Sequence, residues 1–478
     1  MKDKMPDKKT ARPFNGVMID CSRLMEQHDY YFRLLDFMAD WSMNTLLLHF
    51  ADDHGLGLQL PGFKDIAMPE SFTVQEVKRL IAHAEKLGID IIPEVETFGH
   101  TRYLTGQNKY RHLGASEAKQ GFNAVDPLNP ETHKLMRRLL RETAKLFPSR
   151  YLHIGGDEVN LGDYCKIRGI ENADALWAGY VNTVLGYARD EGKQPMFWAD
   201  HAWNNPRIAS LLDKDALALW WQYTRKLPMQ TLRALKKAGF NQLVGAPSVA
   251  CWEYRFGSGR IALENNQAMA RTVSRAKLLG SINTVWCPFR YFQGAIYYGL
   301  AFGAAQTAAG GRMTMREFNE RFVVKTFGIK PTAALMKYLK HWPDVQVRYW
   351  FTDKLLHGNT DFGEGEVAEM SKVQTVWRIL RDLDPDIQPV KNADIWTAMR
   401  LAADAAGLCS EYFELSRDNA AHPERKQDYN RLLRKVRREA GELWDQTRFA
   451  DDPQKKKPKF HHEGHAFALV VLKCLPLL

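Results

Sequence analysis

Residues 72–96 read FTVQEVKRLIAHAEKLGIDIIPEVE and contain one repeat of a helix-then-strand pattern. The first part carries apolar residues at helical spacing, namely Val74, Val77, Leu80, Ile81, Ala84 and Leu87. Gly88 follows them as a helix stop signal. The second part, residues 89–96, is a short apolar run, which is typical of a strand buried on both faces. The stretch therefore predicts an amphipathic helix that leads directly into a strand of a parallel sheet.

The same alternation extends in both directions, from about residue 14 to residue 309. Eight short apolar runs are separated by amphipathic segments, and they occupy residues 16–20, 44–50, 89–96, 150–156, 194–200, 216–221, 240–248 and 282–287. Eight strands with intervening helices in roughly 300 residues are the size and count of a TIM barrel. We therefore predict an α/β fold with a (β/α)8 barrel over residues 14–310, preceded by a flexible N-terminus over residues 1–13.

The strand pattern stops after residue 310, and the segments that follow are long, charged and helical in pattern. They predict a mainly helical C-terminal region over residues 311–478. Within it, residues 451–465 (DDPQKKKPKFHHEGH) are predicted to form a solvated loop. The final apolar segment, residues 467–478, is interrupted by Lys473 and Pro476 and is too short to span a bilayer. It predicts a buried strand or a terminal packing segment.

Composition excludes several classes of protein. The 478 residues are 45% hydrophobic and 26% charged, which is ordinary for a globular chain and unlike collagenous or disordered ones. The net charge of +10 is a mild, unclustered excess, so we expect no nucleic-acid partner. The six cysteines form no C-x-x-C pair, which argues against a zinc ribbon. The first residues lack the apolar core of a secretory signal, and we expect a cytoplasmic location without a membrane.

The sharpest chemical signal is YLHIGGDE, residues 151–158. Two glycines allow a close approach of backbone or ligand, and the adjacent carboxylates of Asp157 and Glu158 follow where the strand ends. Polar and aromatic residues follow the other runs too: Asp20, Asp52, Asp53, Glu96, His100, Asp200, His201, Tyr223, Trp252, Tyr254, Trp286 and Arg290. The ends of barrel strands share one mouth, where catalytic residues gather. The two adjacent acids are therefore predicted to do acid and base chemistry there.

The H-x-G-G-D-E string resembles glycoside hydrolase family 20, the β-N-acetylhexosaminidases. The resemblance runs from about residue 14 to residue 309. The segments GVMIDCSR (16–23), NTLLLHFADDHG (44–55) and PEVETFGHT (93–101) are similar to the family's first three strands. Only 13 residues precede the first strand, so the chain resembles the shorter, hexosaminidase D-like branch, which lacks the N-terminal α+β domain.

The resemblance implies an exo-acting enzyme that removes terminal N-acetylglucosamine or N-acetylgalactosamine by a substrate-assisted, retaining mechanism. Glu158 would be the general acid and then the general base. Asp157 would orient the 2-acetamido group, whose carbonyl oxygen attacks C1, so no protein nucleophile, cofactor or metal is implied. A general acid must hold its proton at the working pH, and the charge of Asp157 with nearby tryptophans would provide a setting that favours this.

The resemblance also implies a relay in which His100 and Asp52 or Asp53 act on the acid. Because residues alternate sides along a strand, we expect only one of the two aspartates to point inward, and the sequence does not say which. His153 is predicted to be a core histidine rather than part of the relay.

Substrate binding is predicted to rest on aromatic side chains, whose faces cover the apolar surface of a sugar. The residues assigned to this role are Trp198, Trp220 and Trp286, with Asp200 beside them, Tyr223 as a donor to the acetamido oxygen, and Trp221 and Trp252 as alternatives. Two positions depart from the family. Asn15 replaces an arginine before the first strand, and Arg290 stands where an acid often holds the sugar. An arginine suits an anionic group, so the glycan is predicted to carry sulfate or another acidic substituent.

Two other functions stay open from the residues alone. One is a metal-dependent barrel hydrolase or deacetylase that uses His49, Asp53, His54, His100 or His153, although no H-x-H or H-x-x-E-H ligand spacing occurs in the barrel. The other is a barrel that binds glycans without cleaving them. The sequence also leaves open the gluco or galacto preference, the linkage, and whether the chain forms a homodimer.

Overall fold

The computed structural model describes residues 13–115, 124–251, 255–359, 361–418, 422–449 and 467–478. The predicted flexible N-terminus, apart from Pro13, lies outside the described residues, as do Trp252, Tyr254 and the predicted loop at 451–465.

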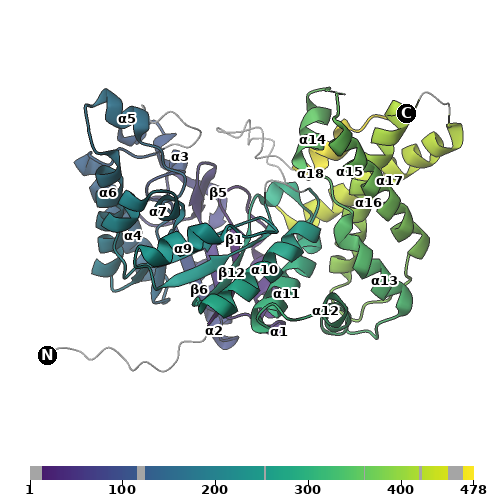
Figure 1. Ribbon diagram of the computed structural model, residues 1–478, viewed down its shortest axis with the longest axis horizontal. Coiled ribbons are helices and arrows are strands. Elements are labelled where there is room, and N and C mark those ends of the chain that lie inside the picture. Colours follow the sequence, from purple (N-terminus) through teal and green to yellow (C-terminus); the bar gives the residue numbers. More distant parts are fainter. Residues whose placement is uncertain (1–12, 116–123, 252–254, 360, 419–421, 450–466) are drawn as a thin grey trace.

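A closed parallel barrel forms the first part of the chain and confirms the predicted fold (Figure 1). Its strands are β1 (Phe14–Asp20), β2 (Thr45–His49), β6 (Asp90–Glu94), β7 (Tyr151–His153), β8 (Gln194–Trp198), β9 (Leu217–Trp221), β10 (Leu243–Ala246) continued by β11 (Ser248–Ala250), and β12 (Gly280–Val285). Each pairs in parallel with its neighbours, and β12 pairs with β1 from Phe14↔Gly280 onward. That last pairing closes the barrel.

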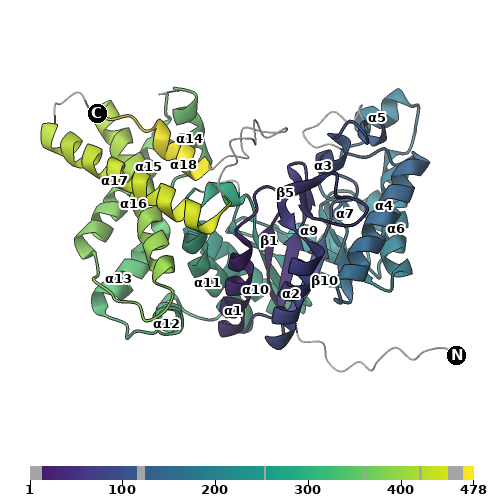
Figure 2. The ribbon, with the colours of Figure 1, turned by 180° about the vertical axis from the view of Figure 1, so that it is seen from behind.

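Helices follow the strands and surround the barrel, as Figure 2 shows from behind. They are α1 (His28–Asp40), α2 (Val74–Lys86), α4 (Pro130–Leu146), α6 (Ala173–Asp190), α8 (Pro206–Leu211), α9 (Met229–Lys237), α10 (Arg260–Ala276) and α11 (Tyr297–Ala308). Their ends have local causes. Thr73 and Glu76 form a capping box at the start of α2, and the Asn129 side chain accepts a backbone hydrogen bond ahead of Pro130 in α4.

The loops at the carboxyl ends of the strands carry additional elements that the sequence did not predict. A small sheet follows β2 and consists of β3 (Ala51–Asp52), β4 (Gly55–Leu58) and β5 (Ala67–Phe72). Short helices follow β6, β7 and β8, namely α3 (Arg102–Thr105), α5 (Gly162–Ile167) and α7 (Asp200–Asn204). These loops shape the barrel mouth.

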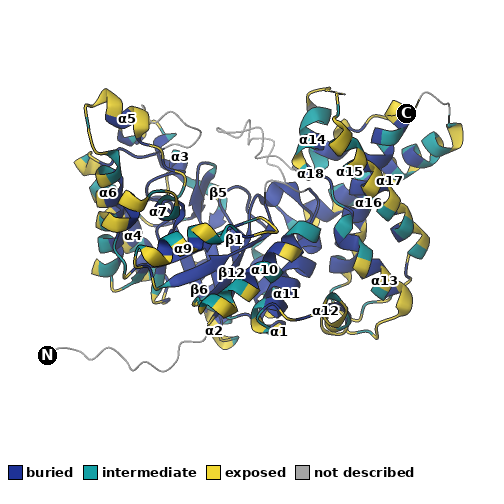
Figure 3. Ribbon diagram, viewed as in Figure 1, coloured by how far each residue is buried: buried dark blue, intermediate teal, exposed yellow. Residues whose placement is uncertain are grey.

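Burial follows the layers of the barrel (Figure 3). Every residue of β1 and of β2 is buried, because helices cover the outer face and side chains fill the interior. Exposed residues lie on the outward faces of the helices, and Figure 3 shows them as the yellow segments.

The C-terminal region is helical, as predicted, and lies beside the barrel (Figures 1 and 2). Its helices are α12 (Met315–Phe322), α13 (Ala333–His341), α14 (Tyr349–Leu356), α15 (Glu364–Leu383), α16 (Ala393–Arg417), α17 (Pro423–Thr447) and α18 (Phe467–Cys474). Within the described part of the chain, no helix combines the length and apolar character that a membrane span requires.

The final apolar segment packs against α17, but the strand alternative for it was wrong. It forms helix α18, because its buried residues recur at helical spacing: Ala468, Val471, Leu472 and Leu475. Arg437 of α17 donates from Nε to the Leu472 carbonyl at 2.9 Å and from Nη2 to the Lys473 carbonyl at 3.0 Å. These bonds fasten the segment to the helical region.

Candidate active site

The tandem acids stand on a turn that only glycine can make. After β7 ends at His153, Gly155 and Gly156 adopt φ values of +72° and +96°. A Cβ atom on Gly155 would lie 2.0 Å from Oε2 of Glu96, whereas the amide of Gly156 donates to that same oxygen at 3.0 Å. The two glycines therefore let the β7 loop rest on Glu96 and turn into the mouth.

Asp157 and Glu158 are neighbours in the chain, but their surroundings differ. The side chain of Asp157 is 13% exposed and that of Glu158 is 40% exposed. Burial raises the pKa of Asp157 to about 7; the charge of His100 opposes this shift, and the charges of Asp200 and Glu158 add to it. Oδ1 of Asp157 is buried and accepts no N–H donor from the described residues, although the Asp157 carboxyl hydrogen-bonds the carboxyl of Glu96. Burial and the charge of Asp157 raise the pKa of Glu96 well above its usual value.

Asp200 and His201 hold the turn in place from the start of α7, which follows the neighbouring strand β8. Oδ2 of Asp200 accepts a hydrogen bond from the Glu158 amide at 3.0 Å, and Nε2 of His201 accepts one from the Val159 amide at 2.9 Å. Glu158 itself has a φ of +53°, which these contacts help to fix. Asp200, predicted to bind substrate, thus contacts the backbone of the acid turn.

Replacing Asp200 by Asn tests the electrostatic cost of this arrangement. Burial and the charge of Glu158 raise the pKa of Asp200 from 3.8 to about 7. The unfolded chain therefore releases this proton first, and the residue destabilises the fold increasingly as pH rises from about 4 to 7. An asparagine keeps an oxygen that can accept the Glu158 amide, and it has no proton to release in this pH range.

We expect the Asp200→Asn variant to melt about 2–5 °C above wild type at pH 7.5 and to lose most of that advantage at pH 5. Calorimetry at the two pH values measures this, and a Tm difference that is the same at both would contradict it.

His100 lies between the acid pair and two aspartates. Its Nε2 is 3.4 Å from Oε2 of Glu158 and 3.9 Å from Oδ2 of Asp157. Its Nδ1 is 3.5 Å from Oδ1 of Asp52 and 3.6 Å from Oδ2 of Asp53. Although burial opposes it, Asp52 and Asp157 raise the pKa of His100 well above its usual value. The geometry thus brings together every residue that was predicted for the relay.

The expectation that only one of the two aspartates points inward was wrong. Strand β3 ends at Asp52, so Asp53 lies in the turn that leads to β4, where the alternation of strand side chains no longer applies. Both carboxylates approach the same nitrogen of His100. They differ in their other partners, because Oδ1 of Asp53 accepts the Arg102 amide at 3.0 Å.

A row of charged side chains underlies the mouth, and Glu94 is the member of it that the sequence argument missed. Strand register aligns Asp20, His49, Glu94 and His153 across β1, β2, β6 and β7. His49 is 2.9 Å from Oδ2 of Asp52 and 3.0 Å from Oε2 of Glu94, and these acids raise its pKa to about 10 despite burial. The sequence PEVE (93–96) contained a signal for Glu94. Glu94 and Glu96 are two residues apart in the apolar run 89–96, so an extended chain places their side chains on the same face.

Arg23 and His153 complete this row in different ways. Arg23 is 2.9 Å from Oδ2 of Asp20 and 2.8 Å from Oδ2 of Asp52, so its charge balances two buried acids. His153 is a buried core residue, as predicted. Its Nδ1 accepts the Gly155 amide at 3.1 Å, and burial lowers its pKa to about 4.

Three aromatic residues gather inside the barrel near the acids. Trp198 is buried and donates from Nε1 to Oε1 of Glu94 at 2.6 Å. Its ring centroid is 5.9 Å from that of Trp286, and Trp286 donates from Nε1 to the Tyr223 hydroxyl at 2.8 Å. The Tyr223 hydroxyl also hydrogen-bonds the side chain of Thr284. Trp198, Tyr223 and Trp286 thus form one connected wall.

Trp220 does not belong to this wall, contrary to the prediction. It is completely buried, and its Nε1 donates at 2.8 Å to the hydroxyl of Thr231 in α9, on the outside of the barrel. The next residue, Trp221, points the other way and packs 5.3 Å from Tyr223, centroid to centroid. Strand alternation places only one of two adjacent tryptophans on the site side.

The two positions that depart from the family pattern lie in different places. Asn15 is at the start of β1, away from the mouth, and its Nδ2 donates to the Ala304 carbonyl at 3.3 Å. Arg290 ends the short helix Pro288–Arg290, directly after β12, and its guanidinium carbon is 5.3 Å from the Phe289 ring centroid. Arg290 is thus in the loop that follows the eighth strand, as predicted.

Among the described residues, three groups of side chains have the proximity that a metal ion requires. They are His49 with Glu94 and Glu96, Asp52 with Asp53 and His100, and His100 with Asp157 and Glu158, each with donor atoms within 4.8 Å of one another. A histidine ligand must be neutral. The neighbouring carboxylates raise the pKa of both His49 and His100 and so favour the protonated form of each ring.

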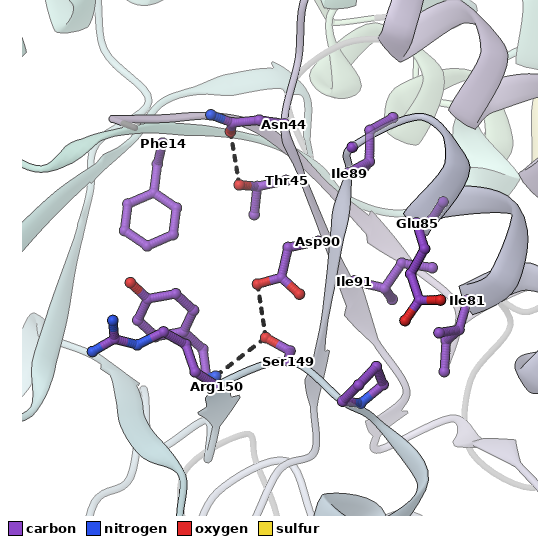
Figure 4. Close-up of a pocket in the computed structure, with 14 residues that line it drawn as sticks. Phe14, Asn44, Thr45, Ile81, Glu85, Ile89, Asp90, Ile91, Ser149 and Arg150 are labelled. Atoms are coloured by element: carbon purple, nitrogen blue, oxygen red, sulfur yellow. Dashed lines mark hydrogen bonds between the residues drawn. The ribbon is translucent and has the colours of Figure 1, made fainter. Parts of the chain in front are cut away.

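A cavity of about 500 Å³ opens at the opposite end of the barrel (Figure 4). Phe14, Thr45, Asp90 and Arg150 line it, at or beside the beginnings of β1, β2, β6 and β7. The Ser149 hydroxyl donates to Oδ2 of Asp90 at 2.8 Å, as the dashed line in Figure 4 shows. None of the predicted site residues lines this cavity, and this end of a TIM barrel serves stability.

Comparisons with known proteins agree with this geometry. The glycosyl hydrolase family 20 catalytic domain matches residues 13–280. Lacto-N-biosidase from Bifidobacterium bifidum is 27% identical over 305 residues, which cover 58% of this chain and 26% of that protein. Beta-hexosaminidase subunit alpha from Mus musculus is 27% identical over 262 residues, which cover 49% of this chain and 48% of that protein. The chain thus spans about half, or less, of the length of these curated relatives.

A solved structure shares the fold. The GH20 exo-β-N-acetylglucosaminidase from Vibrio harveyi, in complex with N-acetylglucosamine, aligns with a TM-score of 0.51 at 20% identity, over 62% of this chain and 54% of that one.

Proposed function

Because the chain belongs to glycosyl hydrolase family 20, we propose that it is an exo-acting β-N-acetylhexosaminidase that removes terminal N-acetylglucosamine or N-acetylgalactosamine from glycans. The observation that carries the proposal is the state of Asp157. This carboxyl is largely buried beside a second acid at the barrel mouth, and its Oδ1 accepts no N–H donor from the described residues. The N–H of a 2-acetamido group supplies the missing donor.

In the proposed reaction, the acetamido carbonyl oxygen of the substrate attacks C1 while Glu158 protonates the departing glycosidic oxygen. Asp157 accepts the acetamido N–H and stabilises the positive charge of the oxazolinium ring that forms. Glu158 then removes a proton from the water that opens this ring. Two inversions at C1 give overall retention. The partial exposure of Glu158 suits a group that meets both leaving group and water.

His100 connects Asp157 and Glu158 to the two aspartates on its other side. Its Nε2 faces both Asp157 and Glu158, and its charge opposes the effect of burial on the pKa of Asp157. A cation at this position favours the ionised Asp157 that the oxazolinium step requires. Asp52 and Asp53 hold the opposite nitrogen and keep the ring charged and oriented.

In the wall of Trp198, Tyr223 and Trp286, the last two are proposed to contact the sugar ring and its acetamido group, and the fully buried Trp198 is proposed to support Trp286. Indole faces shield the apolar C–H surface of a sugar and exclude water from the reacting amide. The Tyr223 hydroxyl, fixed by Trp286, is the proposed donor to the acetamido oxygen. Trp221 replaces Trp220 as the outer aromatic contact.

A finer proposal concerns the substituents of the sugar. Arg290 places a cation in the loop after β12, and a guanidinium pairs with sulfate or carboxylate through two parallel hydrogen bonds. We propose that the enzyme accepts a sulfated or otherwise acidic N-acetylhexosaminide.

A chromogenic panel tests both proposals. We expect wild type to hydrolyse p-nitrophenyl N-acetylglucosaminide or N-acetylgalactosaminide, with activity that survives prolonged EDTA treatment. In the Arg290→Ala variant, kcat/KM for the 6-sulfated analogue is expected to fall at least about tenfold, whereas kcat/KM for the neutral sugars is expected to change little. No turnover of any member would overturn the hydrolase proposal in favour of a glycan-binding barrel. Loss of activity with EDTA would favour metal dependence, and equal effects of Arg290→Ala on neutral and sulfated sugars would refute only the finer proposal.

A further inference from the structure

The end of helix α17 inserts an arginine from the C-terminal region into the barrel. Arg448 follows Thr447, the last residue of α17, and its side chain is completely buried. Its guanidinium carbon lies 3.8 Å from the ring centroid of Trp444, one turn back in the same helix. The stacked ring orients the guanidinium toward the barrel loops and shields it from water.

Arg448 contacts the loop that follows β12. Its Nη2 donates to the carbonyl of Pro288 at 2.7 Å and to the carbonyl of Tyr291 at 2.9 Å. These two carbonyls lie on either side of Arg290. One guanidinium nitrogen therefore fixes the backbone on both sides of a residue that we propose to contact substrate.

This loop needs external support because its own backbone is strained. Cys287 has a φ of +58°, a conformation that a residue with a side chain rarely adopts. Its amide donates to Oδ2 of Asp20 at 3.1 Å, and Trp286 directly precedes it. The loop is thus held from the barrel side by Asp20 and from the side of the helical region by Arg448.

The same arginine holds a second loop of the site. Its Nε is 3.2 Å from Oε2 of Glu26, in the loop between β1 and α1 that also contains Arg23. The neighbouring Gln27 donates from its backbone N–H to the Thr447 carbonyl at 3.1 Å and from its side-chain Nε2 to the Arg448 carbonyl at 3.0 Å. Arg23 in turn bonds Asp20 and Asp52 and lies 5.3 Å from the ring centroid of Trp286.

Chemistry makes this contact specific to arginine. A buried carboxylate that loses its partner and two carbonyls that lose their donor are each costly, so the loops must move to find other partners. A lysine can pair with Glu26, but it lacks the planar fork that reaches the carbonyls and the carboxylate at once. The contact therefore transmits the position of α17 to both loops.

We propose that Arg448 is a positioning residue for the substrate site and that the helical C-terminal region acts, through it, as the outer support of the loop that contains Trp286 and Arg290. The proposal rests on the proposed hexosaminidase function for its effect on kinetics. Its structural part, the fixing of residues 286–291, stands independently of the reaction.

The test compares Arg448→Met with Arg271→Met in the full chain. Both arginines donate to backbone carbonyls, but Arg271 of α10 donates from Nε to the Gly311 carbonyl at 3.0 Å, in the turn that follows α11. We expect Arg448→Met to raise KM for the aryl N-acetylhexosaminide about tenfold, with a smaller change in kcat. Arg271→Met is expected to lower Tm and to leave KM within about twofold of wild type. Arg448→Lys is expected to lie between wild type and Arg448→Met, and it keeps the test available where the methionine variant fails to fold.

Hydrogen exchange separates this proposal from the hydrolase proposal. Backbone amides of residues 286–293 are expected to exchange faster in Arg448→Met, and in part in Arg448→Lys, whereas Arg271→Met leaves them as in wild type. Unchanged exchange in both Arg448 variants would overturn the inference even if the protein hydrolyses the glycoside. Faster exchange in a protein without hexosaminidase activity would support the positioning role and refute only the hydrolase. Equal KM changes in Arg448→Met and Arg271→Met would reduce the role of Arg448 to general stability.

Discussion

Glu158→Gln is expected to lower kcat on an unactivated substrate, such as N,N′-diacetylchitobiose, by about 10²–10⁴-fold. The proposed acid must protonate the glycosidic oxygen, which would otherwise leave as a sugar alkoxide. The carboxamide of the glutamine cannot supply that proton. A p-nitrophenolate leaving group needs little protonation, so the loss on the nitrophenyl glycoside is expected to be clearly smaller. Steady-state kinetics on the two substrates measure this difference, which identifies an acid rather than a binding group.

The replacement leaves the fold intact, which makes the comparison clean. Asp200 bonds the backbone of residue 158 and not its side chain, and the Glu158 side chain is 40% exposed. We expect Tm within about 1 °C of wild type, because substitutions at exposed sites usually change stability little. Equal losses on the two leaving groups would contradict the assignment of Glu158 as the general acid.

Asp157→Asn is expected to lower kcat by about 10²–10³-fold on every substrate, whatever the leaving group. An asparagine oxygen can still accept the acetamido N–H, but its side chain carries no charge to stabilise the oxazolinium ring. The charge is needed mainly in the transition state, so KM is expected to change less than kcat. Kinetics on the same two substrates distinguish this pattern from that of Glu158→Gln.

The stability of this variant provides the control. Burial raises the pKa of Asp157 from 3.8 to about 7, so the ionised carboxyl destabilises the folded protein at neutral pH and above. The asparagine variant is therefore expected to be at least as stable as wild type at pH 7.5. A variant that keeps full turnover, or that loses it only by unfolding, would refute the assigned role of Asp157.

The sequence predicted the barrel because its signal is periodic. Each strand is a short apolar run, each helix places apolar residues on one face, and the eight repeats add to one another. The tandem acids were found for a related reason, since a strand end in a barrel has a known location. Residues 151–158 therefore specified both the element and its position at the mouth.

The predictions that failed depended on the direction of one side chain. Trp220 and Trp221 are adjacent and chemically identical, and only the phase of β9 decides which one packs against Thr231. Asp52 and Asp53 both reach His100 because β3 ends between them, a detail that local propensity does not encode. The contacts of Arg448 with Glu26 and Pro288 join distant parts of the chain and have no local signature at all.

Closure of the barrel through β1 and β12 has a consequence for biosynthesis. Strand β1, which is made before the other strands of the barrel, has one edge that stays without its partner until residues 280–285 have been made. During that interval the nascent barrel exposes an open edge, which can associate with other chains and which chaperones recognise. Arg448 emerges later still, so we expect the loops around Trp286 to acquire their final form only after the barrel has closed.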